Sequence, residues 1–227
     1  LKQKILLIAL IPLLILGVAI TVVSNKKIND AMKVTISDGL RGTATAVRST
    51  FRKMNSEPYT LNENNELVKG DFNISQQVDL ADDIKEVSDI DVSIYFGDTR
   101  YMTSAKDASG QRVLSTLSDT TVKDNVLGQG KEYFTDNVQV SGQQYFGYYI
   151  PLFDFETGET VGMVFAGMQK EIVDSQIRQI TMIIVALAVV LMIFCAVLIF
   201  MIVGKMSKRL SIGVNGRGGT GQTQLQV

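Results

Sequence analysis

Two long apolar runs without any charged side chain enclose a sequence in which polar and apolar residues are mixed. The runs cover residues 5–23 and 180–203. An α-helix rises about 1.5 Å per residue, so each run is long enough to cross the roughly 30 Å hydrocarbon core of a bilayer. The pattern predicts two transmembrane helices, with residues 24–179 forming one folded domain between them.

The first run is also compatible with a cleaved signal peptide. Lys2 and Lys4 would form its basic start, and residues 22–24 would be a poor cleavage site. However, the run exceeds the roughly 7–15 apolar residues of a usual signal core, and a helical pattern continues beyond it. We therefore expect a retained anchor.

The first part of the central region has a helical period. Between residues 25 and 56 the apolar residues recur mostly three or four positions apart, and Pro58 follows the pattern. This spacing places them on one face and predicts a long helix that ends before the proline. A second, shorter helix is expected over residues 76–87.

The period then changes to two, which is typical of strands. Val92 and Ile94 alternate with Asp91, Ser93 and Tyr95. Strands are expected over residues 90–96, 100–104, 132–140, 143–152 and 161–168. A short helix over residues 118–127, capped by Ser118, separates the second strand from the third. Sequential hairpins predict a five-stranded antiparallel meander with helices packed on one face, which is an α+β fold.

Charge placement predicts the orientation in the membrane. All 23 Asp and Glu residues lie between Asp30 and Asp174, whereas the flanks carry only basic residues, among them Lys4 and Lys205. Basic segments close to a membrane span stay in the cytoplasm. We expect a multi-pass protein of the cell membrane, with both termini cytoplasmic and the acidic central domain outside.

Several kinds of chemistry are disfavoured. The chain has no His, and its single cysteine, Cys195, lies in the second apolar run. Zinc or copper binding therefore has few candidate ligands. Neither a Gly-x-Ser-x-Gly motif nor a phosphate-binding Gly loop with Lys-Ser/Thr is found. We expect no enzyme activity, no cofactor and no metal, and the acidic domain argues against nucleic-acid binding.

Tyrosine and arginine are concentrated in the predicted sheet. Arginine offers a planar fork of donors for a carboxylate, and tyrosine adds a hydroxyl on an apolar body. Such groups would bind a small organic anion if they met in a pocket. The alternative is that many of these tyrosines are ordinary sheet residues, since strands favour them. The residues concerned are Tyr95, Arg100, Tyr101, Thr103, Arg112, Tyr133, Tyr145, Tyr148 and Tyr149.

The order of four segments resembles the single-Cache sensor domain of bacterial methyl-accepting chemotaxis proteins. These segments are residues 94–104 (IYFGDTRYMTS), 126–134 (VLGQGKEYF), 140–152 (VSGQQYFGYYIPL) and 158–168 (GETVGMVFAGM). Together with the two apolar runs, the resemblance covers most of the chain up to Leu210. None of the segments is a strict motif, but their order, spacing and position between two spans are specific in combination.

The resemblance implies a PAS-like antiparallel sheet with a long N-terminal helix along it, and a homodimer packed through these helices. It also implies a pocket for a small molecule on the membrane-distal side of the sheet, with carboxylates among the ligands of similar domains. The residues whose positions fit ligand contacts are Tyr95, Arg100, Thr103, Arg112, Tyr133 and Tyr145.

In the family, the second span leads into a HAMP helix pair and a methylated coiled coil that controls a histidine kinase. Residues 204–227 begin like a HAMP segment but continue into a Gly- and Gln-rich tail. We therefore expect a fragment of a longer receptor whose last strand, residues 161–168, moves the second span when ligand binds. A sensor histidine kinase, a cyclic-dinucleotide enzyme, and a membrane-anchored scaffold or adhesion module without a small ligand remain alternatives.

Overall fold

Contacts divide the chain into two compact units. The computed structural model describes the backbone of residues 2–54 and 56–215, and the side chains of residues 11–12, 15–54 and 56–202. One unit is Asn29–Ile177. The other consists of the flanking segments, which end at Ile28 and resume at Arg178.

The flanking segments belong to the helices α1 (Lys2–Met54) and α4 (Lys170–Asn215). Within this unit, the Thr181 hydroxyl donates a hydrogen bond to the Asn25 side-chain oxygen at 3.2 Å. Among the described residues, one helical stretch, Lys170–Ile202, is long and apolar enough to cross a membrane. The expected first span and the HAMP-like segment fall largely on side chains outside that description, so both stay predictions.

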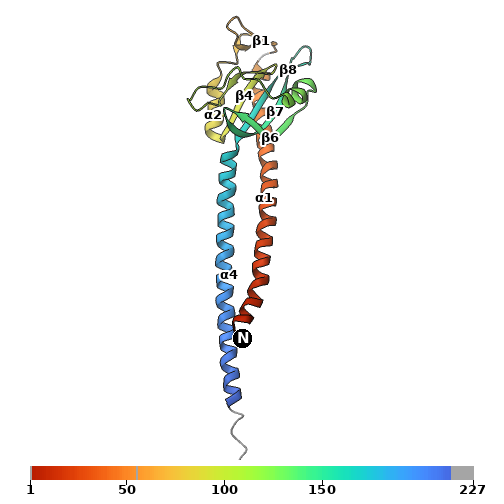
Figure 1. Cartoon of the computed structure of the whole chain (residues 1–227). Helices are drawn as coiled ribbons and strands as arrows, with labels where there is room; N and C mark the ends of the chain where they lie inside the picture. The colour runs from red at the N-terminus through yellow and green to blue at the C-terminus, as the bar shows by residue number, and fades with distance from the viewer. Residues whose placement is uncertain (1, 55, 216–227) are drawn as a thin grey trace, which may run out of the picture. The chain divides into compact units, whose positions relative to one another are not determined.

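A five-stranded antiparallel sheet forms the centre of the Asn29–Ile177 unit (Figure 1). The α+β fold and all five expected strands are confirmed, with ends within two residues of the predicted ones. The strands are β4 (Ile90–Phe96), β5 (Thr99–Thr103), β6 (Tyr133–Val140), β7 (Gln143–Phe153) and β8 (Thr160–Gln169).

The order of the strands differs from the expected meander. It is β5-β4-β8-β7-β6, so β6 forms an edge and β4 pairs with β8. The β4–β8 register runs from Ile90 opposite Met168 to Phe96 opposite Gly162. Short turns identify the hairpin partners, but the connection between β5 and β6 is long. Because this connection is long, the sequence does not show which strand of the β4–β5 hairpin pairs with which strand of the β6–β7–β8 group.

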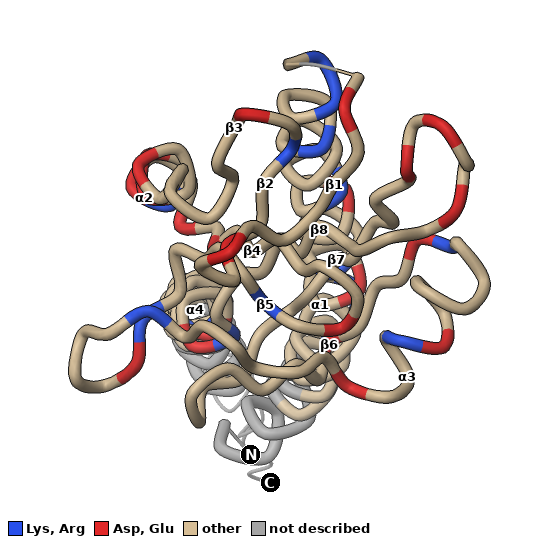
Figure 2. Tube along the Cα trace, turned by 90° about the horizontal axis from the view of Figure 1, so that it is seen from above, with Lys and Arg blue, Asp and Glu red and all other residues tan. Residues whose placement is uncertain are grey.

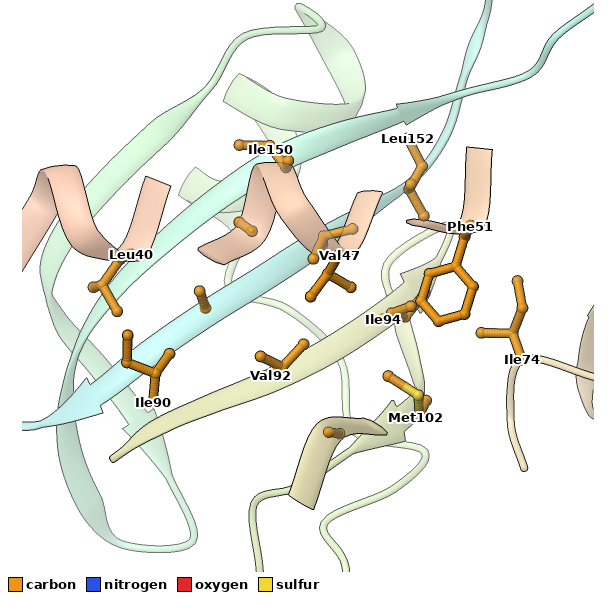
Figure 3. Close-up of a cluster of buried hydrophobic side chains, with 14 of the residues drawn as sticks. Leu40, Val47, Phe51, Ile74, Ile90, Val92, Ile94, Met102, Ile150 and Leu152 are labelled. Atoms are coloured by element: carbon orange, nitrogen blue, oxygen red, sulfur yellow. The ribbon is translucent and has the colours of Figure 1, made fainter. Parts of the chain in front are cut away.

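Helix α1 covers one face of the sheet. Leu40, Val47 and Phe51 point from α1 toward Val92 and Ile94 of β4 (Figure 3). These α1 residues follow the helical spacing, so that one stripe of the helix is buried. Helix α2 (Val78–Ser88) adds Ala81, Val78 and Ile84 to the same cluster.

The other face is covered by a different short helix. Val122 of α3 (Thr120–Lys123) and Val126 of the π-helical turn η1 (Asp124–Gly128) pack in a second apolar cluster. The expectation that all helices lie on one face is therefore wrong. This second face is apolar as well, and it also needs cover. Its core contains Tyr95, Tyr145, Tyr149, Met163 and Phe165.

The start of α3 also differs from the prediction. Asp119, not Ser118, caps this helix, since its carboxylate accepts the backbone N–H of Thr121 at 2.8 Å. Both residues are good caps, so composition alone does not decide between them.

A small three-stranded sheet follows α1 and was not expected. It consists of β1 (Tyr59–Leu61), β2 (Leu67–Lys69) and β3 (Phe72–Asn73), paired in that order. Strands of two or three residues are too short to show a period of two. Leu67 and Tyr59 are nevertheless buried in the cluster beneath α1.

The β4–β8 pairing predicts that Gly162 does not tolerate a side chain. A Cβ there would overlap the backbone oxygen of Tyr95. Gly162→Ala should lower the free energy of unfolding by roughly 1–3 kcal/mol, because β8 must move away from β4. Circular dichroism of the full chain in detergent would record the fall in melting temperature.

Gly42→Ala is the matched control. A Cβ at Gly42, in α1, meets nothing within 4 Å, and Ala is favoured over Gly inside helices. Its melting temperature should stay the same or rise. An unchanged melting temperature for Gly162→Ala would contradict the β4–β8 register.

Candidate functional site

A cavity of about 540 Å³ lies on the face of the sheet opposite α1. Tyr95, Arg100, Tyr133 and Tyr149 line it from the strands β4, β5, β6 and β7. The loop before α3 and the start of α3 complete the wall. Four strands and one helix thus meet around a single space, as is typical of sites for small molecules.

Arg100 is the buried cation of this cavity, with only 5% of its surface exposed. Its Nε donates to the Tyr95 hydroxyl at 2.9 Å, and Nη2 donates to the same oxygen. Nη1 donates to the backbone oxygen of Val113 at 3.3 Å. The guanidinium also lies over the Tyr95 ring, 5.1 Å from its centre. These contacts fix its orientation but bring it no negative charge.

No carboxylate compensates Arg100 among the described residues. None of the six ion pairs found there includes it. Tyr95 does not take that role either, because burial raises the pKa of its hydroxyl, although the nearby Arg100 charge opposes the shift. Burial likewise raises the pKa of Tyr149 well above its ordinary value. A buried charge without a partner is costly, so an anion entering the cavity would be stabilised.

Two hydroxyl groups add hydrogen-bonding capacity. Tyr95 accepts from Arg100, and no acceptor for its own proton is found in the described part of the chain. The Ser118 Oγ is buried and also lacks a partner among the residues that the structure describes. Since buried polar groups are normally paired, each is a candidate contact for a bound ligand.

The edge strand β6 gives the cavity a polar side. Thr135, Asn137 and Gln139 line it together with Tyr133. Tyr133 and Thr135 are two positions apart on one face of the strand, and the register against β7 then shifts between Thr135 and Val138. The Asp119 carboxylate is exposed at the cavity wall and is already engaged as the cap of α3. The arrangement suits a polar, negatively charged molecule.

Tyr95, Arg100 and Tyr133 are the sequence-predicted candidates that line the cavity, whereas Thr103, Arg112 and Tyr145 do not. The Thr103 hydroxyl lies 2.7 Å from the Ser93 hydroxyl and accepts the backbone N–H of Ala105 at 3.0 Å. Thr103 thus makes internal contacts within and beside the β4–β5 pair. We leave it out of the candidate site.

Arg112 binds helix α2 instead of the cavity. Its Nη1 and Nη2 donate to the two carboxylate oxygens of Asp82 at 2.8 and 2.6 Å, and Nη1 also reaches the backbone oxygen of Thr103 at 2.8 Å. This bidentate pair ties the turn after β5 to α2. From the sequence alone, Arg112 and Arg100 were equally good candidates for binding a ligand. The fold distinguishes them, because only Arg100 lines the cavity.

Tyr145 belongs to a buried polar network at the other end of β4. Its hydroxyl donates to Asp91 at 3.0 Å and accepts from the Gln169 side chain at 3.1 Å. Asp91 is 1% exposed and also binds the Ser104 hydroxyl and the Lys85 ammonium, both at 2.8 Å. The network satisfies these groups internally and leaves no role for a ligand.

Sequence reasoning missed Ser118 and the polar residues of β6. The residues of β6 gave no simple alternating signal, because the register shift between Thr135 and Val138 interrupts the two-residue period. Ser118 gave no signal either, since its burial depends on the path of the loop before α3. No cluster of three or more His, Cys, Asp or Glu side chains that could hold a metal is found among the described residues.

One family model matches the part of the chain that forms the five-stranded sheet. The family model "Single cache domain 3" matches residues 72–180, which include the whole five-stranded sheet. This part of the chain is therefore similar to single Cache domains.

Among solved structures, the E. coli DcuS sensor domain is similar at 20% sequence identity, with a TM-score of 0.33. The alignment covers 45% of this chain and 72% of that one. A comparison with curated protein sequences finds no match.

The Arg112–Asp82 pair predicts a dependence of stability on pH. The hydrogen bond from Arg112 lowers the pKa of Asp82. A lowered pKa in the folded state stabilises the fold above the ordinary aspartate value of about 3.9, and this contribution is lost as the pH falls below it. Asp82→Asn should therefore lower the melting temperature at neutral pH, and the difference from wild type should shrink toward about pH 3.

The neighbouring exposed residue offers the control. Asp83→Asn removes the same charge next to Asp82, but Asp83 is in none of the ion pairs in the described part of the chain. It should leave the melting temperature nearly unchanged across this range. Equal effects of the two substitutions at neutral pH would argue against the pair.

Proposed function

We propose that the chain is the sensing part of a transmembrane receptor, and that the Arg100 cavity binds a small organic anion, a carboxylate. The observation that carries the proposal is Arg100 itself. It is a buried guanidinium at a cavity wall, oriented by a tyrosine and a carbonyl, with no carboxylate partner among the described residues. A ligand carboxylate would supply the missing charge in the planar geometry that arginine favours.

The size and lining of the cavity support a small, polar ligand. Its volume of about 540 Å³ lies within the roughly 300–1,000 Å³ of small-molecule sites. Arg100, the Tyr95 hydroxyl and Ser118 Oγ would bind the carboxylate. Thr135 and Asn137 on β6 would contact hydroxyl or amine groups elsewhere on the ligand. Binding a ligand requires no catalysed reaction, and we propose that the domain is not an enzyme.

The route of the signal follows from the connectivity. Strand β8 ends at Gln169 and α4 begins at Lys170, so no loop separates them. We propose that ligand binding shifts β8 and that α4, the candidate membrane span, carries the change across the membrane to a cytoplasmic signalling region. A ligand acts in this way only through its different affinities for the two states.

The resemblance to methyl-accepting chemotaxis proteins favours a chemoreceptor that acts as a homodimer, with both termini cytoplasmic and a kinase as its downstream partner. The input part of a sensor histidine kinase or of a cyclic-dinucleotide enzyme is the competing role for the same domain. These roles differ in the kind of signalling region to which the sensing part is joined.

A thermal-shift screen of the full chain in detergent tests the binding site. A panel of mono-, di- and tricarboxylates at millimolar concentration should contain a compound that raises the melting temperature by mass action. Arg100→Gln should weaken its binding by about tenfold or more, because a charge-assisted hydrogen bond is lost. Ser118→Ala should weaken it less.

Lys106→Gln is the control, since it removes one positive charge from the same domain at an exposed residue outside the cavity. It should bind the compound like the wild type. The proposal would be contradicted if no compound in a broad panel raised the melting temperature, or if Arg100→Gln bound the compound as tightly as the wild type.

A further inference from the structure

A second cavity, of about 280 Å³, lies where the end of α1 meets the small sheet and the β7–β8 turn. Arg48 and Arg52 of α1 line it, with Tyr59 of β1 and Lys69 of β2. Figure 2 shows several Lys and Arg positions close together around β1 and β2. The two cavities share no lining residue.

The cationic side chains repel one another unless something compensates them. Arg48 and Arg52 are four positions apart on one helix face, where like charges destabilise the helix. The Arg48 Nη1 donates to the backbone oxygen of Pro151 at 3.2 Å, but neither arginine takes part in an ion pair within the described part of the chain. Lys69, which is 3% exposed, lines the same wall, and its ammonium donates to the backbone oxygen of Glu57 at 2.7 Å.

Neither acidic group at this wall forms an ion pair with Arg48 or Arg52 among the described residues. Burial raises the pKa of Tyr59 to about 12, even though Arg48 and Arg52 act in the opposite direction. Its phenol therefore stays neutral. Asp154 is the carboxylate among the lining residues, and its Oδ1 accepts the backbone N–H groups of Glu156 and Thr157 at 3.0 and 2.9 Å. Asp154 thus holds the β7–β8 turn and interacts with Lys69, while Arg48 and Arg52 keep their positive charge without an ion pair in the described part of the chain.

Aromatic side chains make the wall amphipathic. Phe153 and Phe155 line the cavity and are 45% and 63% exposed. Large exposed aromatic side chains beside arginines are typical of binding surfaces, where the ring covers an apolar body and the guanidinium binds an anionic group. A bare inorganic anion would leave these rings unused.

We propose that this second cavity binds a compact anion with a carboxylate or phosphate head on an apolar, aromatic body. Arg48 and Arg52 hold the head, and Phe153 and Phe155 cover the body. Because Tyr59 and Lys69 come from the small sheet, a bound molecule connects the end of α1 to that sheet. The site is separate from the Arg100 cavity and does not depend on it.

Basic residues near the end of a helix also complement the unpaired carbonyl groups there. Arg52 and Lys53 both lie in the last turn of α1. That role would be common to both, but only Arg52 lines the cavity. Lys53 is therefore the matched control that separates ligand binding from helix stabilisation.

The test uses the full chain in lipid nanodiscs and 4-fluorobenzoate as the probe, observed by fluorine NMR line broadening, with phenyl phosphate as competitor. We expect saturable binding to wild type at millimolar concentrations or below. Arg52→Gln should raise the dissociation constant about tenfold, as expected for the loss of a charge-assisted contact. Lys53→Gln should bind like wild type.

Four results would overturn the proposal. They are the absence of binding of both probes to wild type, full binding by Arg52→Gln, an equal loss in Lys53→Gln, and loss in Arg100→Gln alone. The last result would place the probe in the Arg100 cavity, so failure here leaves the proposed carboxylate site standing. Melting temperatures of all variants, measured without probe, check that each is folded.

Discussion

The antiparallel pairing of β4 with β8 is the contact on which the rest of the domain depends. It joins the β4–β5 hairpin to the β6–β7–β8 group, which are far apart in sequence. Gly162 lets the two backbones approach closely beside Tyr95. Without this pairing, Arg100 on β5 and Tyr133 on β6 would not share a cavity, and β8 would be an edge strand instead of the middle strand of the sheet.

Once the sheet is closed in this way, both of its faces need cover. The face of Val92 and Ile94 is buried by the apolar stripe of α1 and by α2. The face of Tyr95 and Phe165 is covered only partly, by the short α3 and η1. Because this cover is incomplete, the Arg100 cavity stays open on that face. The position of the site therefore follows from the difference in length between the helices on the two faces of the sheet.

Arg112, Arg100 and Arg52 illustrate how the surroundings of an arginine decide its role. Arg112 has a bidentate carboxylate partner, and the pair ties α2 to the turn after β5. Arg100 is more deeply buried but has only neutral partners. Arg52 belongs to a cationic wall with exposed aromatic side chains beside it. A guanidinium with a carboxylate partner is structural, whereas those without one are where an anion would bind.

By itself the sequence determined the local elements. The apolar period of three and four predicted α1 and its buried face, and the period of two predicted the five strands, because these spacings reflect the geometry of each element. Alternation also placed Tyr95 on the face of β4 opposite Val92 and Ile94. The two apolar runs predicted membrane spans from length and composition.

Only the tertiary structure decided which elements meet. The β4–β8 pairing, the cover of the second face by α3, and the partners of Arg100, Arg112 and Tyr145 all join residues distant in sequence. The small sheet and its basic cavity were also beyond sequence reasoning, since strands of two or three residues carry no period. Local patterns show which face of a helix or strand is apolar. Which elements pack against one another depends on how all the apolar faces of the domain are buried at the same time.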